Sequence, residues 1–225
     1  ELVRIDFRYV STAYEIWALG HMLAVIEPAM AELASQDEAQ TLAELRRGGW
    51  ADDDAEVDLA FQDIREKRDF VLPRYMRGAF IVSLWACYEA GVQAIARQMH
   101  DEGYGPIAFR ELRGESFIDR SRRYFGAILE MPLDEDADRY TRLVDLYRVR
   151  TVLAHANGAR DGVSPQRWVE LEGVFERSGV LVDDTRGLII LPRAYVQAAY
   201  EDVSASLESL VARARDHPDG PSRGS

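Results

Sequence analysis

Cysteine is almost absent from this chain of 225 residues, in which Cys87 is the only one. A single cysteine cannot form an intrachain disulfide, so the fold has to be held together by its apolar core. Chains without disulfides are typical of reducing compartments, and we therefore expect a cytoplasmic protein. Long uncharged apolar runs are missing too, since none approaches the roughly 20 residues of a membrane span. The sequence thus predicts no membrane partner.

The signatures of common catalytic sites are also missing. No cluster of His, Cys and Asp residues has the spacing of metal ligands, and His21, His100 and His217 each stand alone. The chain contains neither a Gly-x-Ser-x-Gly motif nor a glycine-rich phosphate loop. We interpret the acidic run at 52–54 as a helix start rather than a cation site, because helix N-termini favour acidic side chains. These absences predict a protein without a metal or other cofactor.

Helical periodicity dominates the rest of the chain. Hydrophobic residues make up 47% of the sequence, which is enough for a sizeable core. The segment 74–101 is the most apolar and predicts a central core helix. Pro28 is expected to kink or end a first helix over 8–34, and a second helix is expected over 36–47.

Strand patterning is confined to one short stretch, where two apolar runs at 180–182 and 188–191 flank the turn sequence of 183–187. This pattern is typical of a β-hairpin. The absence of alternating βαβ patterning argues against a doubly wound nucleotide-binding fold. The predicted fold class is all-α, an antiparallel helix bundle with one small β-hairpin before the last helix. The expected parts are an N-terminal helical extension over 1–59, a helical domain over 60–215 and a disordered tail over 216–225.

The net charge is strongly negative, −12, with a pI near 4.8. Repulsion from phosphates therefore opposes non-specific binding of nucleic acids. The segment 139–160 is the exception, because it holds five arginines against Asp145 alone, a local charge of +4 (5 − 1). These arginines are Arg139, Arg142, Arg148, Arg150 and Arg160. A basic segment on an acidic chain favours a small phosphate site over a long nucleic-acid track.

The most informative motif lies at the end of a helix expected over 136–156, where four residues separate Arg150 from His155. Apolar residues share one side of this helix, and the dipeptide 157–158, Asn-Gly, is a helix stop. An arginine binds a phosphate through a forked pair of hydrogen bonds, and a histidine moves a proton near neutral pH. The pair therefore supplies the two groups that metal-free RNA cleavage needs.

In this motif the chain resembles the HEPN superfamily, all-α domains whose ribonuclease members carry an arginine, four to six residues and then a histidine. A polar residue usually follows the arginine in that family, and Thr151 fills the position. The segment 77–90 is similar to the long central helix of the family, and the likeness covers roughly residues 60 to 213. The resemblance implies a HEPN-like domain over 60–215 that cleaves RNA as a metal-independent endoribonuclease, in the role of a toxin or antiviral defence effector.

The geometry of the pair adds a requirement. Residues five positions apart are about 140° apart around a straight helix, so Arg150 and His155 do not share a face. They converge if His155 is at a frayed helix end, or if two copies meet across a two-fold axis. HEPN ribonucleases work as dimers with a composite cleft, so the resemblance implies a homodimer. It also implies a 2′,3′-cyclic phosphate product and, as a further partner, a cognate inhibitor or defence-system protein.

The remaining site candidates are Glu89, Tyr147, Arg148, Thr151 and Asn157. By resemblance Glu89 orients Arg150, and the alternative is a solvated glutamate at the helix edge. Asn157 either contacts substrate or only ends the helix, while Tyr147 and Arg148 either extend the phosphate site or cover the surface. In HEPN toxins silenced by a nucleotidyltransferase, a tyrosine stands where this chain has Asn157, so control by that route is not expected.

Two other functions stay open on the sequence alone. A bundle of this fold can dimerise or dock a partner without cleaving anything, as a binding module. An arginine-rich helix end can also bind the phosphate of a small ligand, as a sensor. In both cases Arg150 is a surface arginine and His155 a histidine that ends a helix.

Overall fold

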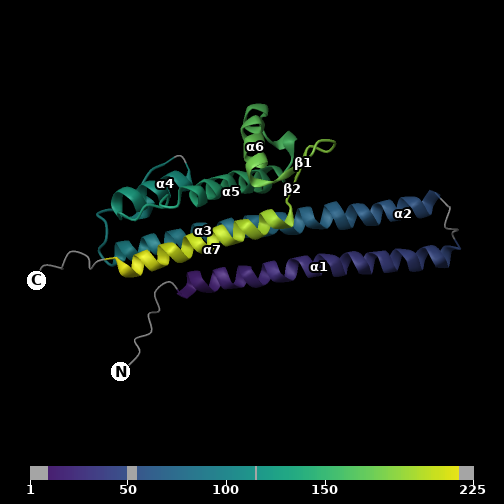
Figure 1. The fold of residues 1–225 in the computed structure, drawn as a ribbon, viewed down its shortest axis with the longest axis horizontal. Coiled ribbons are helices and arrows are strands. Elements are labelled where there is room, and N and C mark those ends of the chain that lie inside the picture. The colour runs from purple at the N-terminus through teal and green to yellow at the C-terminus, as the bar shows by residue number, and fades with distance from the viewer. Residues whose placement is uncertain (1–9, 50–54, 115, 218–225) are drawn as a thin grey trace, which may run out of the picture. The chain divides into compact units, whose positions relative to one another are not determined.

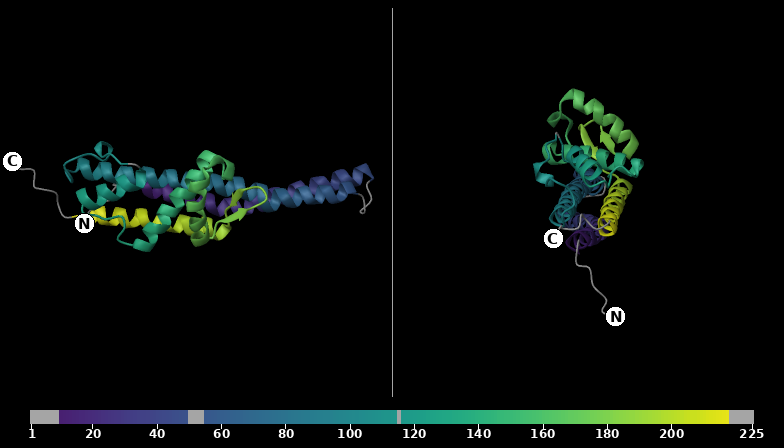
Figure 2. Two further views of the ribbon diagram at one scale, coloured as in Figure 1. Left: turned by 90° about the horizontal axis from the view of Figure 1, so that it is seen from above. Right: turned by 90° about the vertical axis from the view of Figure 1, so that its left-hand side faces the viewer.

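The computed structural model describes residues 10–49, 55–114 and 116–217, and most of them are helical (Figure 1). The helices are α1 (Val10–Gly48), α2 (Ala55–Glu66), α3 (Leu72–Asp101), α4 (Phe117–Arg123), α5 (Ala137–Ala156), α6 (Pro165–Ser178) and α7 (Arg193–Asp216). Two strands, β1 (Leu181–Asp183) and β2 (Leu188–Ile190), form an antiparallel hairpin directly before α7 (Figure 2). The predicted all-α bundle with one small hairpin is confirmed.

Short irregular helical turns join some of these elements. A π-helical turn over Lys67–Val71 links α2 to α3, and a second one over Tyr124–Ile128 extends α4. The first turn stands directly before Pro73, whose ring cannot donate a backbone hydrogen bond. The distortion beside this proline is therefore a widened turn inside a continuing helix.

The prediction of two separate N-terminal helices is wrong, because α1 runs unbroken from Val10 to Gly48 with Pro28 inside it. A proline inside a helix costs roughly 3 kcal/mol. Apolar residues with helical spacing continue on both sides of the proline, and their burial offsets this cost. The buried residues of this stretch are Leu23, Ile26, Met30 and Ala34.

The chain consists of two compact units, each assembled from separate segments of the sequence. The first unit contains Glu1–Leu19, Ser83–Arg150 and Gln197–Ser225, and the second contains Gly20–Val82 and Thr151–Val196. This division differs from the predicted parts over 1–59 and 60–215, which stay a prediction. Of the predicted tail, Asp216 ends α7 and His217 follows it, while residues 218–225 lie outside the described part of the chain.

Trp85 of α3 is the centre of the first unit and is fully buried. Its ring centroid lies 5.3 Å from that of Tyr147 on α5 and 6.3 Å from that of Phe117 on α4. The hydroxyls of Tyr88 and Ser206, 3.5 Å apart, connect α3 to α7. This unit is thus a helix bundle whose members are joined by aromatic contacts and a buried polar pair.

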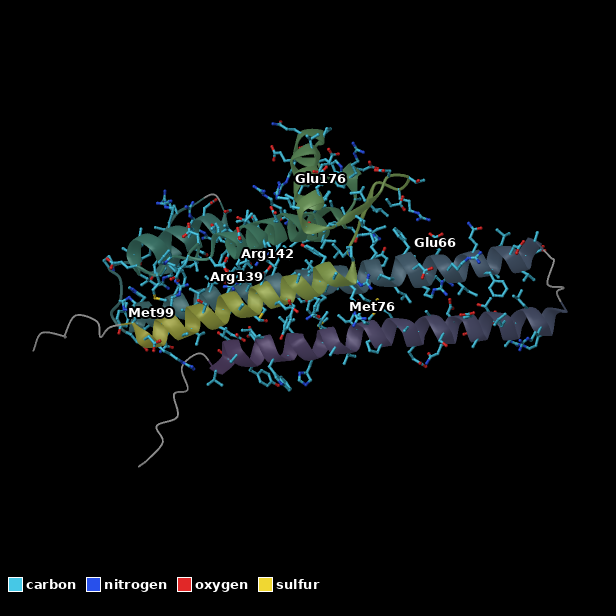
Figure 3. All side chains as sticks on the ribbon, in the orientation of Figure 1. Glu66, Met76, Met99, Arg139, Arg142 and Glu176 are labelled. Atoms are coloured by element: carbon cyan, nitrogen blue, oxygen red, sulfur yellow. The ribbon has the colours of Figure 1, made fainter. Side chains whose placement is uncertain are left out.

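The second unit is held partly by one arginine that reaches three elements. Arg77 of α3 forms a two-pronged ion pair with Glu27 of α1, with nitrogen–oxygen distances of 2.8 and 2.9 Å. It also donates to the carbonyl of Leu191 after β2, at 3.0 Å. At the hairpin, Arg186 pairs with Glu66, labelled in Figure 3, at 3.0 Å. Charged contacts therefore connect α1, the end of α2, the start of α3 and the hairpin within this unit.

Two helical stretches have the length and mean hydropathy of a membrane span. They are Val10–Gly48, with a mean hydropathy of 1.2 in its most apolar window, and Ala55–Asp101, with 1.4. The core helices of soluble proteins meet the same criteria. In the second stretch 56% of that window is buried, as in a core helix, whereas in the first the buried share is 22%.

Candidate active site

Helix α5 carries both residues of the Arg–His motif. It begins at a cap, where a carboxylate oxygen of Asp136 accepts a hydrogen bond from the backbone N–H of Arg139 at 2.9 Å. Its apolar residues recur every three positions and are buried, and these are Leu143, Leu146, Val149 and Val152. The helix is therefore anchored along its length by one side, which fixes where the polar residues between these positions project.

The turn after α5 ends the helix as the sequence predicts. Asn157 and Gly158 both have left-handed backbones, with φ of 49° and 71°. The N–H of Gly158 donates to the carbonyl of Val152 at 3.1 Å, and its carbonyl accepts from Ile189 of β2 at 3.0 Å. Asparagine and glycine are the residues that best tolerate this conformation. The helix end is thus tied to the hairpin within the second unit.

Arg150 is half-buried in α5, in the part of the helix that belongs to the first unit. Its Nε is buried and has no hydrogen-bond partner among the described residues. Buried donors are nearly always paired, so an unpaired one calls for an explanation. Its guanidinium also makes no ion pair within the described chain, and it can therefore bind an external anion.

His155 is exposed in the last turn of α5, in the part that belongs to the second unit. The helix continues to Ala156, so His155 lies in regular helix and not at a frayed end. The meeting of two copies, one of the two arrangements that bring an imidazole to the Arg150 guanidinium, stays a prediction.

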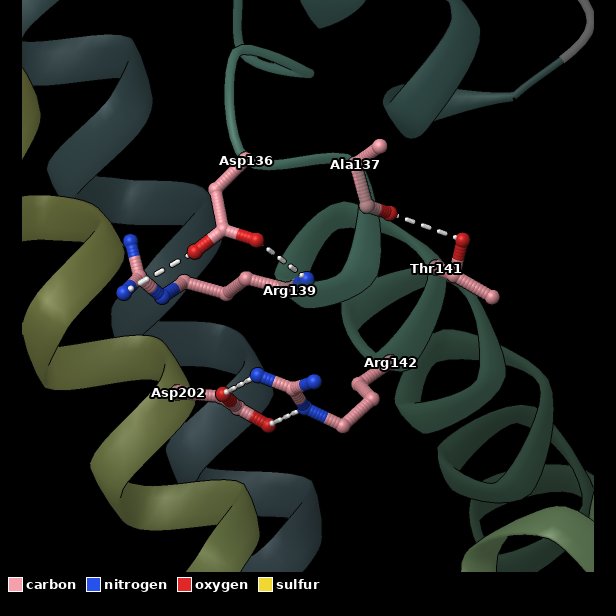
Figure 4. A network of polar contacts seen from close by, with 6 residues as sticks. All are labelled: Asp136, Ala137, Arg139, Thr141, Arg142 and Asp202. Carbon is pink, nitrogen blue, oxygen red and sulfur yellow. Dashed lines mark hydrogen bonds and ion pairs between the residues drawn. The ribbon is translucent and has the colours of Figure 1, made fainter.

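The basic segment 139–160 is less positive than its sequence indicates, because three of its arginines are ion-paired. Arg139 pairs with Asp136 at 3.1 Å, and Arg142 binds Asp202 of α7 through two hydrogen bonds of 2.7 Å each (Figure 4). Arg148 lies 3.4 Å from Asp145. Only Arg150 and Arg160 remain without an ion pair in the described structure, and the guanidinium of Arg160 lies over the Trp168 ring.

Glu89 has a partner other than the one that the family resemblance implies. Its carboxylate accepts a hydrogen bond of 2.7 Å from the indole N–H of Trp85, one turn earlier on α3. The Trp85 ring in turn lies against Tyr147, three residues before Arg150. Glu89 is thus held in a chain of side chains that leads toward the motif, and its predicted role in orienting Arg150 stays a prediction.

The other predicted support residues differ in exposure. Tyr147 and Thr151 are half-buried, and Arg148 is exposed. The carboxylate that pairs with Arg148, that of Asp145, is itself almost fully buried. Arg148 therefore lies beside a buried acid, and its predicted role in the phosphate site stays a prediction.

Arg74 and Tyr75, at the start of α3, contact the motif and were not predicted from the sequence. Arg74 donates to the carbonyl of Asn157 at 2.6 Å, and its guanidinium lies 4.9 Å from the centre of the Tyr75 ring. Hydrogen bonds from the Arg74 and Asn157 side chains lower the pKa of the Tyr75 hydroxyl. The contact joins residues 83 positions apart, and no local pattern reveals a pairing over that separation.

The site contains groups for acid–base and phosphate chemistry but no metal-ligand set. Within residues 10–49, 55–114 and 116–217, no group of three or more His, Cys, Asp or Glu side chains could hold a metal ion. Comparison with protein-family models, with curated proteins and with solved structures finds no match to this chain. The function therefore has to be argued from the residues themselves.

Proposed function

We propose that this protein is a metal-independent endoribonuclease of the HEPN type, with Arg150 and His155 as its catalytic pair. The observation that carries the proposal is the exposure and the ion pairing of these two side chains in α5. His155 is exposed, and the half-buried Arg150 has a guanidinium without an ion pair in a chain of net charge −12. An anion-binding group left free in so acidic a protein favours a phosphate substrate.

In the proposed reaction, the His155 imidazole accepts the proton of a ribose 2′-hydroxyl, and that oxygen attacks the adjacent phosphorus. The bond to the 5′-oxygen of the next nucleotide breaks, and this oxygen takes up a proton from an imidazolium. The products are a 2′,3′-cyclic phosphate and a free 5′-hydroxyl. Arg150 binds two non-bridging oxygens and stabilises the charge that grows on them.

Arg74 and Tyr75 are proposed as positioning residues. They hold the backbone and the side chain of Asn157, two residues after His155, from the start of α3. Asparagine tolerates a left-handed backbone better than most residues, but it still adopts one at some cost and keeps it where its surroundings fix it. These contacts therefore fix the direction in which the last turn of α5 presents the imidazole.

The composite cleft is proposed to form between two copies of the chain. Because α5 is regular past His155, one protomer does not bring its imidazole onto the face of its own Arg150. Two copies related by a two-fold axis place the histidine of one beside the arginine of the other. This proposal includes a cytoplasmic role as a toxin or defence effector, restrained by a cognate inhibitor.

Cleavage of RNA in excess EDTA tests the activity. We expect wild type to produce fragments ending in a 2′,3′-cyclic phosphate, and the His155→Ala variant to produce none. His21→Ala is the matched control, because His21 is also an exposed helical histidine, and it should cleave at the wild-type rate. Equal cleavage by wild type and His155→Ala would contradict the assignment of His155 as a catalytic residue.

Induced expression in cells tests the biological role. We expect wild type to arrest growth and His155→Ala to leave growth unaffected at equal protein level. Arrest by both variants would show that toxicity does not come from RNA cleavage at this site.

A non-catalytic binding module is the second candidate, and exposed apolar side chains favour it. In the second unit Val25 and Leu59 are each 63% exposed and Leu33 is 46% exposed. Contiguous exposed apolar patches are typical of protein-contact surfaces, and this candidate proposes that these side chains form such a patch. Absence of RNA cleavage, together with unchanged self-association of His155→Ala, would favour this candidate over the nuclease.

A further inference from the structure

A cavity of about 340 Å³ lies in the first unit, between the C-terminal part of α3 and the loop that follows it. Helix α3 contributes Gln93, Arg97, His100 and Asp101, and the loop contributes Phe109 and Arg110. The volume is within the range of small-molecule sites. None of these residues belongs to the proposed catalytic pair or to its supporting contacts.

The polar residues from α3 share one face of the helix. Their spacings of four, three and one positions place Gln93, Arg97, His100 and Asp101 along a single side. The chain then turns back sharply, with Tyr104 donating to the carbonyl of Met99 at 2.9 Å. This turn brings the loop over the same face of α3.

An aromatic cluster holds the loop side of the cavity in place. Phe109 is buried, and its ring centroid lies 5.3 Å from that of Tyr124 and 6.0 Å from that of Phe117. The hydroxyl of Tyr124 donates to the carbonyl of Ile107 at 3.2 Å. Because the loop is anchored directly before Arg110, the cavity is formed before any ligand arrives, and binding costs little ordering of the chain.

The charge in this cavity is opposite to that of the protein. Arg97 and Arg110 are exposed, and neither makes an ion pair or hydrogen bond with any described side chain. Asp101 is the only acid in the lining, so the lining residues carry +1 (2 − 1) before any contribution from His100. The Nδ1 of His100 is buried without a hydrogen-bond partner in the described structure. The cavity thus offers several unused groups to an anion.

A second cavity in the same unit provides a comparison. It measures about 420 Å³ and is also lined by two arginines, Arg139 and Arg213. Each of these is paired with an acid, Arg139 with Asp136 at 3.1 Å and Arg213 with Glu135 at 2.9 Å. The larger cavity is therefore neutral, and unpaired arginines distinguish the smaller one.

We infer that the cavity beside α3 binds the phosphate monoester of a small molecule. Two guanidinium groups offer more donors than one carboxylate accepts, whereas a phosphate monoester has three terminal oxygens and a double negative charge. The Gln93 amide and the Phe109 ring, which also line the cavity, can contact the rest of such a molecule. The site is a second function of the chain and does not depend on the proposed nuclease activity.

Calorimetric titration with inorganic phosphate, AMP and adenosine tests the inference. We expect one site per chain for AMP, weaker binding of phosphate and none of adenosine. Arg97→Gln and Arg110→Gln should each weaken AMP binding roughly tenfold or more, because each removes charged hydrogen bonds. Arg46→Gln, an exposed arginine in the last turn of α1, makes the same change in net charge and should bind as wild type does.

Asp101→Asn provides a test in the opposite direction. It removes the only acid of the lining, so we expect tighter binding of AMP, which damage to the fold cannot produce. Equal affinity of wild type, Arg97→Gln and Arg110→Gln, or no binding of AMP by wild type, would overturn the inference. Loss of RNA cleavage in these variants without any binding of AMP would show instead that the cavity contacts RNA.

Discussion

Arg150 is half-buried in α5, and its guanidinium has no ionic partner in the described structure. Substitution by lysine therefore separates the contribution of Arg150 to the fold from its contribution to phosphate binding. Lysine keeps the stem and the charge, and the Nε that it lacks makes no hydrogen bond in the protein. What lysine loses is the planar fork that binds two phosphate oxygens.

We therefore expect Arg150→Lys to lower the RNA cleavage rate about 100- to 1,000-fold, as the loss of one transition-state contact does. The free energy of unfolding should change by roughly 0.5 kcal/mol or less. Cleavage kinetics and thermal unfolding of the same preparations measure both. A thermal midpoint many degrees below wild type would make Arg150 a structural residue, and wild-type values of both quantities would exclude a catalytic role.

Tyr75 should ionise before Tyr88 and Tyr124. Hydrogen bonds from Arg74 and Asn157 lower the pKa of its hydroxyl, whereas burial raises the pKa of Tyr88 to about 12. Burial also raises the pKa of Tyr124. In an absorbance titration of phenolate formation, Tyr75→Phe should remove a step below the usual value of about 10 and leave the steps of Tyr88 and Tyr124 in place.

The lowered pKa of Tyr75 also predicts how the free energy of unfolding changes with pH. Where the pH lies between the folded pKa of Tyr75 and the usual value of about 10, the folded state has lost a proton that the unfolded state keeps. The free energy of unfolding of wild type, relative to Tyr75→Phe, should then rise with pH through this window. Denaturant titrations at successive pH values measure it, and a difference that falls with rising pH would contradict the contact between Tyr75 and Arg74.

At the scale of elements, the turn after α5 connects the motif to the hairpin. Gly158 has φ of 71°, and a Cβ added there would lie 3.0 Å from Cγ1 of Ile189. Gly179, which ends α6, has the same φ of 71° with nothing within 4 Å of such a Cβ. A side chain would strain the backbone at both glycines. Only at Gly158 would the added Cβ also crowd a neighbouring side chain.

Gly179→Ala should lower the free energy of unfolding by about 1–2 kcal/mol, the cost of a left-handed alanine. Gly158→Ala should lower it further, because Ile189 has to move. Chemical denaturation of both variants measures the difference. If the two variants are equally stable, the helix end does not pack on β2 as described.

For the whole molecule, the proposed activity requires association of two copies. A monomer with net charge −12 repels a second copy, so the interface has to be local and well matched. We expect a homodimer whose interface includes α5. Ala154 is exposed beside His155, and Ala154→Glu should shift the mass measured by light scattering toward the monomer. Ala43→Glu, at an exposed position on α1, should leave it unchanged, and a monomeric wild type would refute the shared cleft.

The sequence alone determined the fold class, the hairpin and the bounds of α3 and α5. Periodic apolar residues and the Asn157–Gly158 stop predict α5 almost to the residue, since helix periodicity and left-handed ends are local properties. Local signals misjudged Pro28, where burial of apolar residues along α1 offsets the lost hydrogen bond. The Arg–His pair was also visible in the sequence, because both members lie on one helix.

Tertiary structure decided which charges remain free and which distant residues meet. The positive segment around α5 is mostly neutralised by acids, among them Asp202 on α7, which stands 60 positions from Arg142. The contact of Arg74 with Asn157, and the cavity that joins Arg97 to Arg110, likewise depend on how the chain returns on itself. An ion pair or a cavity is set by distances in space, and a sequence specifies those only through the complete packing of its elements.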